Sequence, residues 1–318
     1  MMRIKGPLAK RNQPILNPLD FCPMGRNGVY VMENRIEIAG LTKRLGRFEL
    51  SIDKLQVPAG FITGFIGENG AGKTTTIKLI LDMIRPDGGT ISILGHDAQK
   101  AGHLAKADLG YVGDDAGYWP SMKLRAIAKM TAPFFPYWDW PFFDRLLDRF
   151  HLDAGAKYAS LSKGMKKQFE LAMALCHHPK LIILDEPTAN LDPLVRRDIL
   201  DLLLEMMEKE ECTVFFSTHI TSDLDHAADY IAFLHRGRML LFGDKETLTE
   251  NHCIVKGPVS LLDGSAEKKF ISFQKNSFGF EALCDDPAWA RDTFGTEAVY
   301  ETPDIEQIFI GYTRKDEQ

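Results

Sequence analysis

The sequence predicts an α/β fold built around a mostly parallel sheet. From about residue 33 to residue 248, short runs rich in β-branched and aromatic residues alternate with helical patterns, which is typical of βαβ units. The chain has 318 residues, 45% of them hydrophobic, so it is long enough to bury a full core. One apolar run also leads through a glycine-rich turn directly into a helical stretch, which is another sign of this fold class.

The expected strands are short and apolar, and most are bounded by turn-forming residues. They span residues 35–39, 48–53, 61–66, 90–94, 109–112, 181–184, 213–216, 230–234 and 239–242. Helical patterns are expected to follow Gly72, Met122, Pro141, Ser162, Pro193 and Ile220. No motif described below occurs twice, so the chain is expected to hold one copy of the functional unit.

The two ends of the chain differ in character from its central part. Residues 1–31 carry Pro, Gly, Asn and basic residues without steady periodicity, so we expect a loose leader, with Met24 and Met32 as alternative starts. The main domain is expected over residues 32–250. Residues 251–318 are expected to form a small accessory segment, with a strand at FISFQ and a last helix after Pro303.

Charge and cysteine content exclude several function classes. The net charge is −6, and interspersed Lys and Arg form no basic face, so nucleic-acid binding is disfavoured. The cysteines are an odd, widely spaced set without CxxC pairs, which suggests neither a disulfide framework nor a zinc site and favours a reducing cytoplasmic setting. They are Cys22, Cys176, Cys212, Cys253 and Cys284. The longest apolar runs fall well short of the roughly 20 residues that a spanning helix needs, so we expect no membrane crossing.

A glycine-rich motif, GENGAGKT, follows the apolar run FITGFI. Its glycines let successive backbone N–H groups point at phosphate oxygens, and the following helix N-terminus adds partial positive charge. We expect Lys73 to hold the β- and γ-phosphates and Thr74 to ligate Mg²⁺. The alternative is a glycine-rich turn with no ligand. The expected phosphate-binding residues are Gly67, Glu68, Asn69, Gly70, Ala71, Gly72, Lys73, Thr74 and Thr75.

A second motif, LIILDEP, reads as a buried strand that ends in two adjacent carboxylates. Acidic residues at the carboxyl edge of a parallel strand lie at the phosphate-facing rim of such a sheet. Asp185 is therefore expected to bind Mg²⁺ through its water shell, and Glu186 to polarise the attacking water. The alternative is a pair of surface carboxylates that merely follow a core strand.

Three further motifs complete a recognisable series: LSKGM from residue 161, ANLD from residue 189 and STH from residue 217. In their order, and with 185 − 73 = 112 positions between Lys73 and Asp185, the five motifs resemble the ABC ATPase series. The resemblance covers about residues 33–248. It implies a P-loop NTPase fold, with a RecA-like core, an antiparallel β subdomain and an inserted helical subdomain at about residues 115–178.

The resemblance assigns roles to the three later motifs. Ser162 and Gly164 of LSKGM would contact the γ-phosphate bound to the opposite subunit, although Ser162 could simply cap a helix. His219 would be the switch histidine that contacts the γ-phosphate and helps position water, although a histidine at a strand end often caps the next helix. Asp192 would contact the partner across a dimer, cap the helix that begins at Pro193, or do both.

Several positions depart from the family pattern. In LSKGM, Lys163 and Met165 replace the Gly and Gln of the family's LSGGQ signature. Asp114 stands where the family has its Q-loop glutamine, and an aspartate there can still bind Mg²⁺ or water but cannot donate a hydrogen bond. We expect Asp114 to be a coupling residue. The adenine-stacking aromatic residue is replaced by Leu45, which leaves Phe48 as the expected substitute.

Residues 132–150 are dense in aromatic side chains, at the place where the family inserts its helical subdomain. Helical spacing of Phe142, Phe143, Leu146, Leu147 and Phe150 favours a core role. The alternative is that part of this stretch forms the groove that receives a coupling helix of a membrane permease.

The resemblance therefore implies an ATP-binding and ATP-hydrolysing subunit, with Mg²⁺, of a bacterial exporter-like transporter. Its partners would be a second ATPase subunit, as a homodimer or a paired ATPase, and a separately encoded integral membrane permease. The chain would lie peripherally at the cytoplasmic face of the membrane. The alternatives are a soluble ABC protein of translation or repair, which would need a second ATPase unit or a coiled-coil insertion, and an interaction protein that has lost catalysis.

Overall fold

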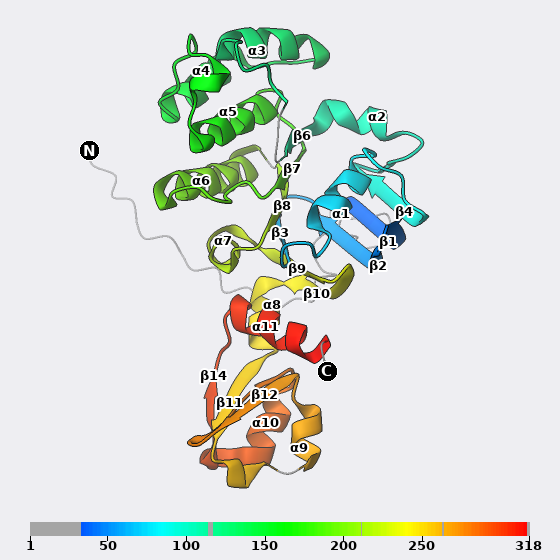
Figure 1. Cartoon of the computed structure of the whole chain (residues 1–318), viewed down its shortest axis with the longest axis vertical. Coiled ribbons are helices and arrows are strands. Elements are labelled where there is room, and N and C mark those ends of the chain that lie inside the picture. Colours follow the sequence, from blue (N-terminus) through cyan, green and yellow to red (C-terminus); the bar gives the residue numbers. More distant parts are fainter. Residues whose placement is uncertain (1–32, 114–116, 211, 263, 317–318) are drawn as a thin grey trace, which may run out of the picture. The chain divides into compact units, whose positions relative to one another are not determined.

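All nine strands expected before residue 248 are present, and they belong to one ten-stranded sheet (Figure 1). The computed structural model describes residues 33–113, 117–210, 212–262 and 264–316. The expected leader at residues 1–31, its alternative starts Met24 and Met32, and Asp114 lie outside the described residues.

Half of this sheet is parallel, as the sequence predicts. The strands follow the order β9, β3, β8, β7, β6, and each pairs with its neighbour in parallel. Such an arrangement brings the carboxyl ends of the strands to one edge, where loops can carry functional side chains. The strands are β3 (Ile62–Ile66), β6 (Leu109–Val112), β7 (Leu181–Asp185), β8 (Thr213–Thr218) and β9 (Tyr230–His235).

The other half contains the antiparallel β part that the family resemblance implies. β1 pairs with both β2 and β4, and β2 pairs with β10 through a single parallel pair, Ser51 with Arg238. β10 in turn pairs antiparallel with β9 of the parallel half. The two-residue strand β5 was not expected, because it is too short to show a pattern. These strands are β1 (Asn34–Leu45), β2 (Phe48–Pro58), β4 (Gly88–Ile93), β5 (His96–Asp97) and β10 (Arg238–Asp244).

Six helices begin within two residues of the expected positions: α4 starts one residue before Pro141, α6 starts at Pro193, and α3 starts two residues after Met122. The Asp139 carboxylate caps α4 by accepting from the backbone N–H of Phe142 at 2.8 Å, which fixes the start of the helix. The short helix α2 (Gly102–Ala105) was not expected. The six are α1 (Lys73–Ile80), α3 (Leu124–Thr131), α4 (Trp140–Arg149), α5 (Lys163–Leu175), α6 (Pro193–Glu210) and α7 (Thr221–Ala227).

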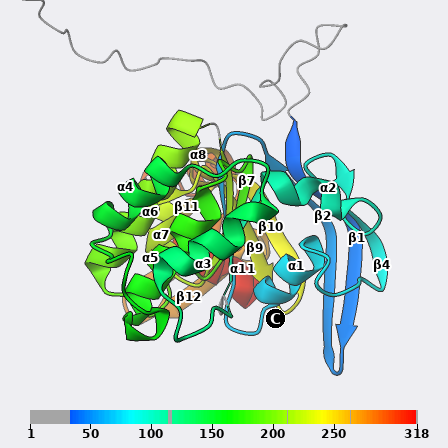
Figure 2. The ribbon, with the colours of Figure 1, turned by 90° about the horizontal axis from the view of Figure 1, so that it is seen from above.

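Two apolar cores lie on the two faces of the parallel strands. Along β7, Ile182 and Leu184 belong to the core that includes residues of α3 to α7, whereas Leu181 and Ile183 belong to the core that includes α1. This alternation follows from the two-residue period of a strand. Figure 2 shows α4, α5 and α6 on one side of these strands and α1 and α2 on the other.

The aromatic stretch at residues 132–150 contributes mainly to the first core. Phe143, Leu146, Leu147 and Phe150 are buried there, as their helical spacing predicts, while Trp138 and Trp140 are partly buried against it. Other aromatic side chains nearby remain at the surface: Phe134 is 85% exposed and Tyr137 is 59% exposed.

Residues beyond α8 (Lys245–Glu250) form a second, four-stranded antiparallel sheet with its own helices. The expected strand at FISFQ and the helix after Pro303 are present as β12 and α11. α11 packs against the first core through Ile305 and Ile308, and Thr221 on α7 donates to Glu306 at 3.1 Å. The remaining elements are β11 (Cys253–Gly257), β12 (Ser272–Asn276), β13 (Gly279–Cys284), β14 (Val299–Glu301), α9 (Gly264–Lys269), α10 (Pro287–Phe294) and α11 (Ile305–Asp316).

None of the helices in the described ranges combines the length and the apolar composition that a membrane crossing requires.

Candidate active site

The glycine-rich loop connects β3 to α1, and two of its glycines have no room for a side chain. A Cβ on Gly67 would lie 2.4 Å from the Leu234 carbonyl oxygen. Gly72 adopts φ +112°, where L-residues are strained, and a Cβ there would lie 2.9 Å from Cζ of Phe48. These two positions therefore accept only glycine, and they fix the path of the loop from β3 into the start of α1.

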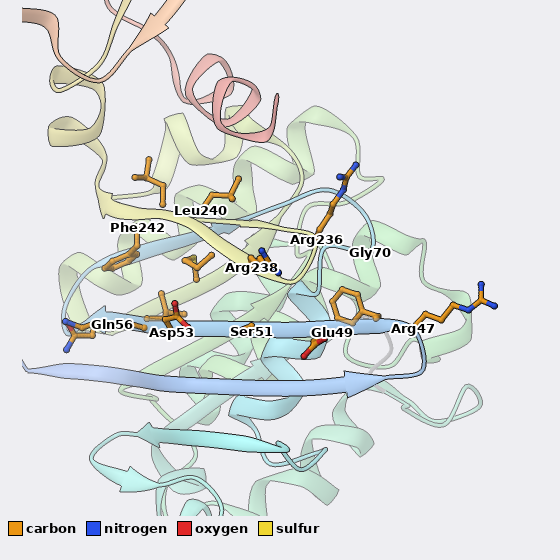
Figure 3. A pocket seen from close by; sticks show the side chains of 15 residues that line it. Arg47, Glu49, Ser51, Asp53, Gln56, Gly70, Arg236, Arg238, Leu240 and Phe242 are labelled. Atoms are coloured by element: carbon orange, nitrogen blue, oxygen red, sulfur yellow. The ribbon is translucent and has the colours of Figure 1, made fainter. Parts of the chain in front are cut away.

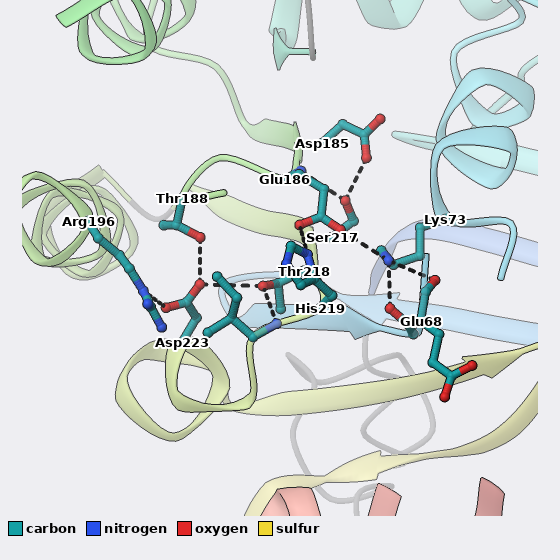
Figure 4. Close-up of polar contacts among 12 residues, drawn as sticks. Glu68, Lys73, Asp185, Glu186, Thr188, Arg196, Ser217, Thr218, His219 and Asp223 are labelled. Carbon is teal, nitrogen blue, oxygen red and sulfur yellow. Dashed lines mark hydrogen bonds and ion pairs between the residues drawn. The ribbon is translucent and has the colours of Figure 1, made fainter. Parts of the chain in front are cut away.

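Lys73 is the first residue of α1, and its ammonium group is buried beneath this loop (Figure 4). Nζ donates to the carbonyl oxygens of Gly67 at 2.6 Å and Glu68 at 3.2 Å, and it lies 3.0 Å from Oε1 of Glu186. The structure thus brings together two groups that are 113 positions apart in the sequence (186 − 73). A positive charge held at the loop is what an incoming triphosphate would need.

Asp185 ends the buried strand β7, and its carboxylate is buried as well. The Ser217 hydroxyl donates to Oδ1 of Asp185 at 2.6 Å and accepts from the backbone N–H of Glu186 at 3.0 Å. Ser217 lies opposite Asp185 in the parallel register of β7 and β8. From the sequence, Ser217 was identified only as part of STH; its position at the end of an expected strand was the signal for this role.

Glu186 has a left-handed backbone, with φ +50°, immediately after the strand. Such conformations are costly for residues other than glycine and cluster at functional sites. Its second oxygen, Oε2, lies 2.8 Å from Nδ1 of His219, which follows β8. The carboxylate of Glu186 is thus held between the ammonium group of Lys73 and the imidazole of His219.

These groups line one cavity of about 940 Å³. The expected site residues that line this cavity are Phe48, Glu68, Asn69, Gly70, Gly72, Lys73, Thr74, Thr75, Asp185, Glu186 and His219. Six further residues line the cavity, and none of them was expected to have a site role, although Leu45 was named as the replacement for an aromatic residue. They are Leu45, Lys78, Met83, Tyr111, Ala189 and Asn190. Gly67, Ala71, Ser162 and Gly164 are not among the described residues that line it. A glycine-rich loop, a buried ammonium group and a carboxylate at a strand end fit a triphosphate with Mg²⁺.

A larger groove of about 1110 Å³ lies between β2 and β10 (Figure 3). It shares Phe48 and Gly70 with the first cavity, but its described lining includes neither Lys73 nor either strand-end carboxylate. Phosphoryl chemistry needs those groups, so we assign the candidate active site to the smaller cavity.

Ser162 and Asp192 both cap helices, as the simpler alternatives predicted. The Ser162 hydroxyl accepts from the backbone N–H of Met165 at 3.2 Å at the start of α5. The Asp192 carboxylate accepts from Val195 at 3.1 Å at the start of α6. The side chain of Ser162 is exposed, so capping leaves it accessible to a partner.

Comparison with known proteins identifies the family. The ABC transporter family model matches residues 50–189. The bacitracin transport ATP-binding protein BcrA of Bacillus licheniformis is 33% identical over 66% of this chain and 69% of its own length, and BcrA of Enterococcus faecalis is 30% identical over the same shares. The chain belongs to the ABC transporter family. It is an ATP-binding and ATP-hydrolysing transporter subunit, as the motif series predicts.

A solved structure supports the same assignment. An ATP-binding subunit of an ABC transporter superposes with a TM-score of 0.61 at 28% identity, over 68% of this chain and 92% of that chain. The P-loop fold expected for this ABC subunit is therefore confirmed. Because the relatives are transporter subunits, the alternatives of a translation or repair protein and of an inactive binder are not supported.

Proposed function

We propose that this subunit powers export through a separately encoded permease by ATP-driven closure of two ATPase subunits. Relatives that are 30–33% identical to this chain are named for bacitracin transport, for daunorubicin and doxorubicin resistance, and for Nod factor export. The observation that carries the ATPase site is the position of the Glu186 carboxylate between Lys73 and His219. In this proposal the chain lies peripherally at the cytoplasmic face of the membrane, on the permease.

Lys73 and the glycine-rich loop bind the triphosphate. The Thr74 hydroxyl and, through water, Asp185 would hold Mg²⁺, which when bound offsets the charge of the β- and γ-phosphate oxygens. The Ser217 hydroxyl keeps the Asp185 carboxylate in place. Asp114 would take the place of the usual glutamine beside the γ-phosphate, and Phe48, with Leu45, would contact the adenine.

Glu186 orients the attacking water. In the described structure both of its oxygens are engaged, one by Lys73 and the other by His219. When the phosphates attract Lys73, Oε1 becomes free to accept a hydrogen bond from water, while His219 holds the other oxygen. Hydrolysis then depends mostly on positioning and charge stabilisation, as phosphoryl transfer generally does.

The partner subunit completes the site. Ser162 and Gly164 do not line the described part of this chain's own cavity, and Ser162 is exposed at a helix N-terminus, which favours anions. We propose that they contact the γ-phosphate bound to the second subunit, a copy of this chain or a paired ATPase. Lys163, in place of the family's glycine, adds positive charge there.

A Glu186→Gln variant tests the proposed site. Glutamine keeps the shape but cannot polarise water, so we expect ATP turnover to fall by about 100-fold or more, with ATP binding retained. The variant should form a dimer in Mg-ATP, measured by size-exclusion chromatography with light scattering. Glu250→Gln, an exposed position on α8, is the control. Turnover at the wild-type rate in Glu186→Gln would refute the role.

A further inference from the structure

An ion pair between Arg196 on α6 and the buried Asp223 on α7 lies beside the proposed site (Figure 4). Asp223 is only 1% exposed, and Nε of Arg196 donates to its Oδ1 at 2.6 Å. Neither residue is among those lining the cavity, so neither contacts the nucleotide in the proposed function. Burying a carboxylate is costly, and similar volumes of apolar side chain often stabilise a protein as well. The pair therefore calls for a role other than stability.

The second oxygen of Asp223 connects the two loops that carry the proposed catalytic groups. Oδ2 accepts from the Thr188 hydroxyl at 2.5 Å and lies 3.4 Å from the Thr218 hydroxyl. Thr188 follows Glu186 by two residues, and Thr218 immediately precedes His219. One carboxylate thus fixes both sides of the contact between Glu186 and His219.

The turn after His219 depends on the same network. The Thr218 hydroxyl accepts from the backbone N–H of Ile220 at 3.0 Å, and Nη2 of Arg196 donates to the Ser222 hydroxyl at 2.6 Å. Rotation of the Asp223 side chain would therefore release a threonine on each loop and loosen the turn that orients the imidazole.

Arg196 connects this network to the loop that begins α6. Its backbone N–H donates to the Asp192 carbonyl oxygen at 3.0 Å, and Asp192 caps the same helix. A shift of the loop at residues 189–192 would consequently move Arg196 and, through the ion pair, Asp223.

We propose that Asp223 is a positioning residue that holds His219 against Glu186, and that Arg196 transmits the position of the 189–192 loop to it. The inference rests on the proposed roles of Glu186 and His219. In this proposal the 189–192 loop regulates hydrolysis through this one ion pair. A partner subunit that contacts the loop would strengthen or weaken the pair.

The test uses the purified full chain with Asp223→Asn, which keeps the shape and removes the charge. We expect kcat for ATP to fall about tenfold or more, with KM within about threefold, because the cavity lining is unchanged. Arg196→Gln should likewise lower kcat and leave KM within about threefold. This variant carries the test if Asp223→Asn does not fold. Arg196→Lys should recover part of kcat. The control is Arg197→Ala, whose side chain is 74% exposed.

A double-mutant cycle with His219→Ala distinguishes positioning from a general structural effect. If Asp223 acts through His219, the double variant should be no slower than His219→Ala alone. Multiplication of the two losses would overturn the proposal, and so would an unchanged kcat in both Asp223→Asn and Arg196→Gln. If His219→Ala and Glu186→Gln themselves leave turnover unchanged, the proposed function fails instead.

Discussion

His177, just after α5, illustrates how the environment of one side chain sets a pH response. Its ring is buried and stacks on Phe135 with centroids 4.0 Å apart, and Nε2 lies 3.1 Å from the Leu109 carbonyl oxygen. Nδ1 is buried with no hydrogen-bond partner among the described residues. Burial, with a smaller contribution from the nearby His178, lowers the pKa of His177 to about 4 from its ordinary 6.5, although the contact with Leu109 opposes this.

The sign of the stability change follows from that pKa. Between pH 4 and 6.5 the unfolded chain binds a proton at His177 that the folded chain does not, so stability rises with pH across this window. The contribution of the neutral His177 to the free energy of unfolding is fully present above pH 6.5. It falls as the solution is acidified, by at most about 3 kcal/mol.

We therefore expect His177→Gln, which cannot be protonated, to flatten the pH dependence of the free energy of unfolding. Glutamine can still donate to the Leu109 carbonyl oxygen. Urea unfolding of the full chain at a series of pH values measures the slope, with His103→Gln, at an exposed position, as the control. Parallel curves for the wild type and His177→Gln would contradict the assignment.

At the scale of elements, two exposed aromatic side chains beside α4 need an explanation that the core does not supply. Phe134 and Tyr137 are 85% and 59% exposed, whereas the neighbouring Trp138 and Trp140 are partly buried against the first core. Exposed apolar side chains that cluster often mark an interface. If part of this stretch contacts the permease, these two residues are therefore better test positions than the tryptophans.

The double variant Phe134→Ala/Tyr137→Ala should lose most co-purification with the permease from detergent-solubilised membranes while keeping basal ATPase activity. The reason is that both side chains lie outside the buried core and away from the cavity lining. Phe278→Ala, at a 94% exposed position in the turn between β12 and β13, is a matched control. Unchanged co-purification of the double variant would rule out this contact.

Periodicity predicted the elements of the main sheet, because its strands are long enough and apolar enough to show a pattern. It did not predict β5 or α2, which have two and four residues, nor β14, which has three. The expectations also left out α8, β11, α9, β13 and α10, none of which is longer than eight residues. Such short elements are specified by their neighbours rather than by their own composition. The starts of α4, α5 and α6 were predictable because Pro141, Ser162 and Pro193 mark them locally.

At the scale of the whole molecule, topology assembles the candidate site. The sheet order places β3, β8 and β7 side by side and parallel, so the loops after Ile66, Asp185 and Thr218 meet at one edge. The rule that ligands bind at the carboxyl ends of parallel strands made this meeting predictable from the motifs.

The side-chain contacts were not predictable in the same way. Nothing in the sequence indicates that Glu186 lies between Lys73 and His219, or that Arg196 and Asp223 pair, because these contacts depend on rotamers and on helix packing over long separations. Phe48 and Leu45 both line the cavity, so the adenine contact remains a prediction.

The central claim is that the loop from Gly67 to Thr74, with the ammonium group of Lys73, binds the triphosphate of Mg-ATP. Isothermal titration of Mg-ATP into the full chain tests this most directly, with Lys73→Ala alongside the wild type. The account predicts saturable, Mg-dependent binding that Lys73→Ala weakens by about tenfold or more, because a charge-assisted contact worth roughly 1.5–3 kcal/mol is lost. Undiminished affinity in Lys73→Ala would contradict it.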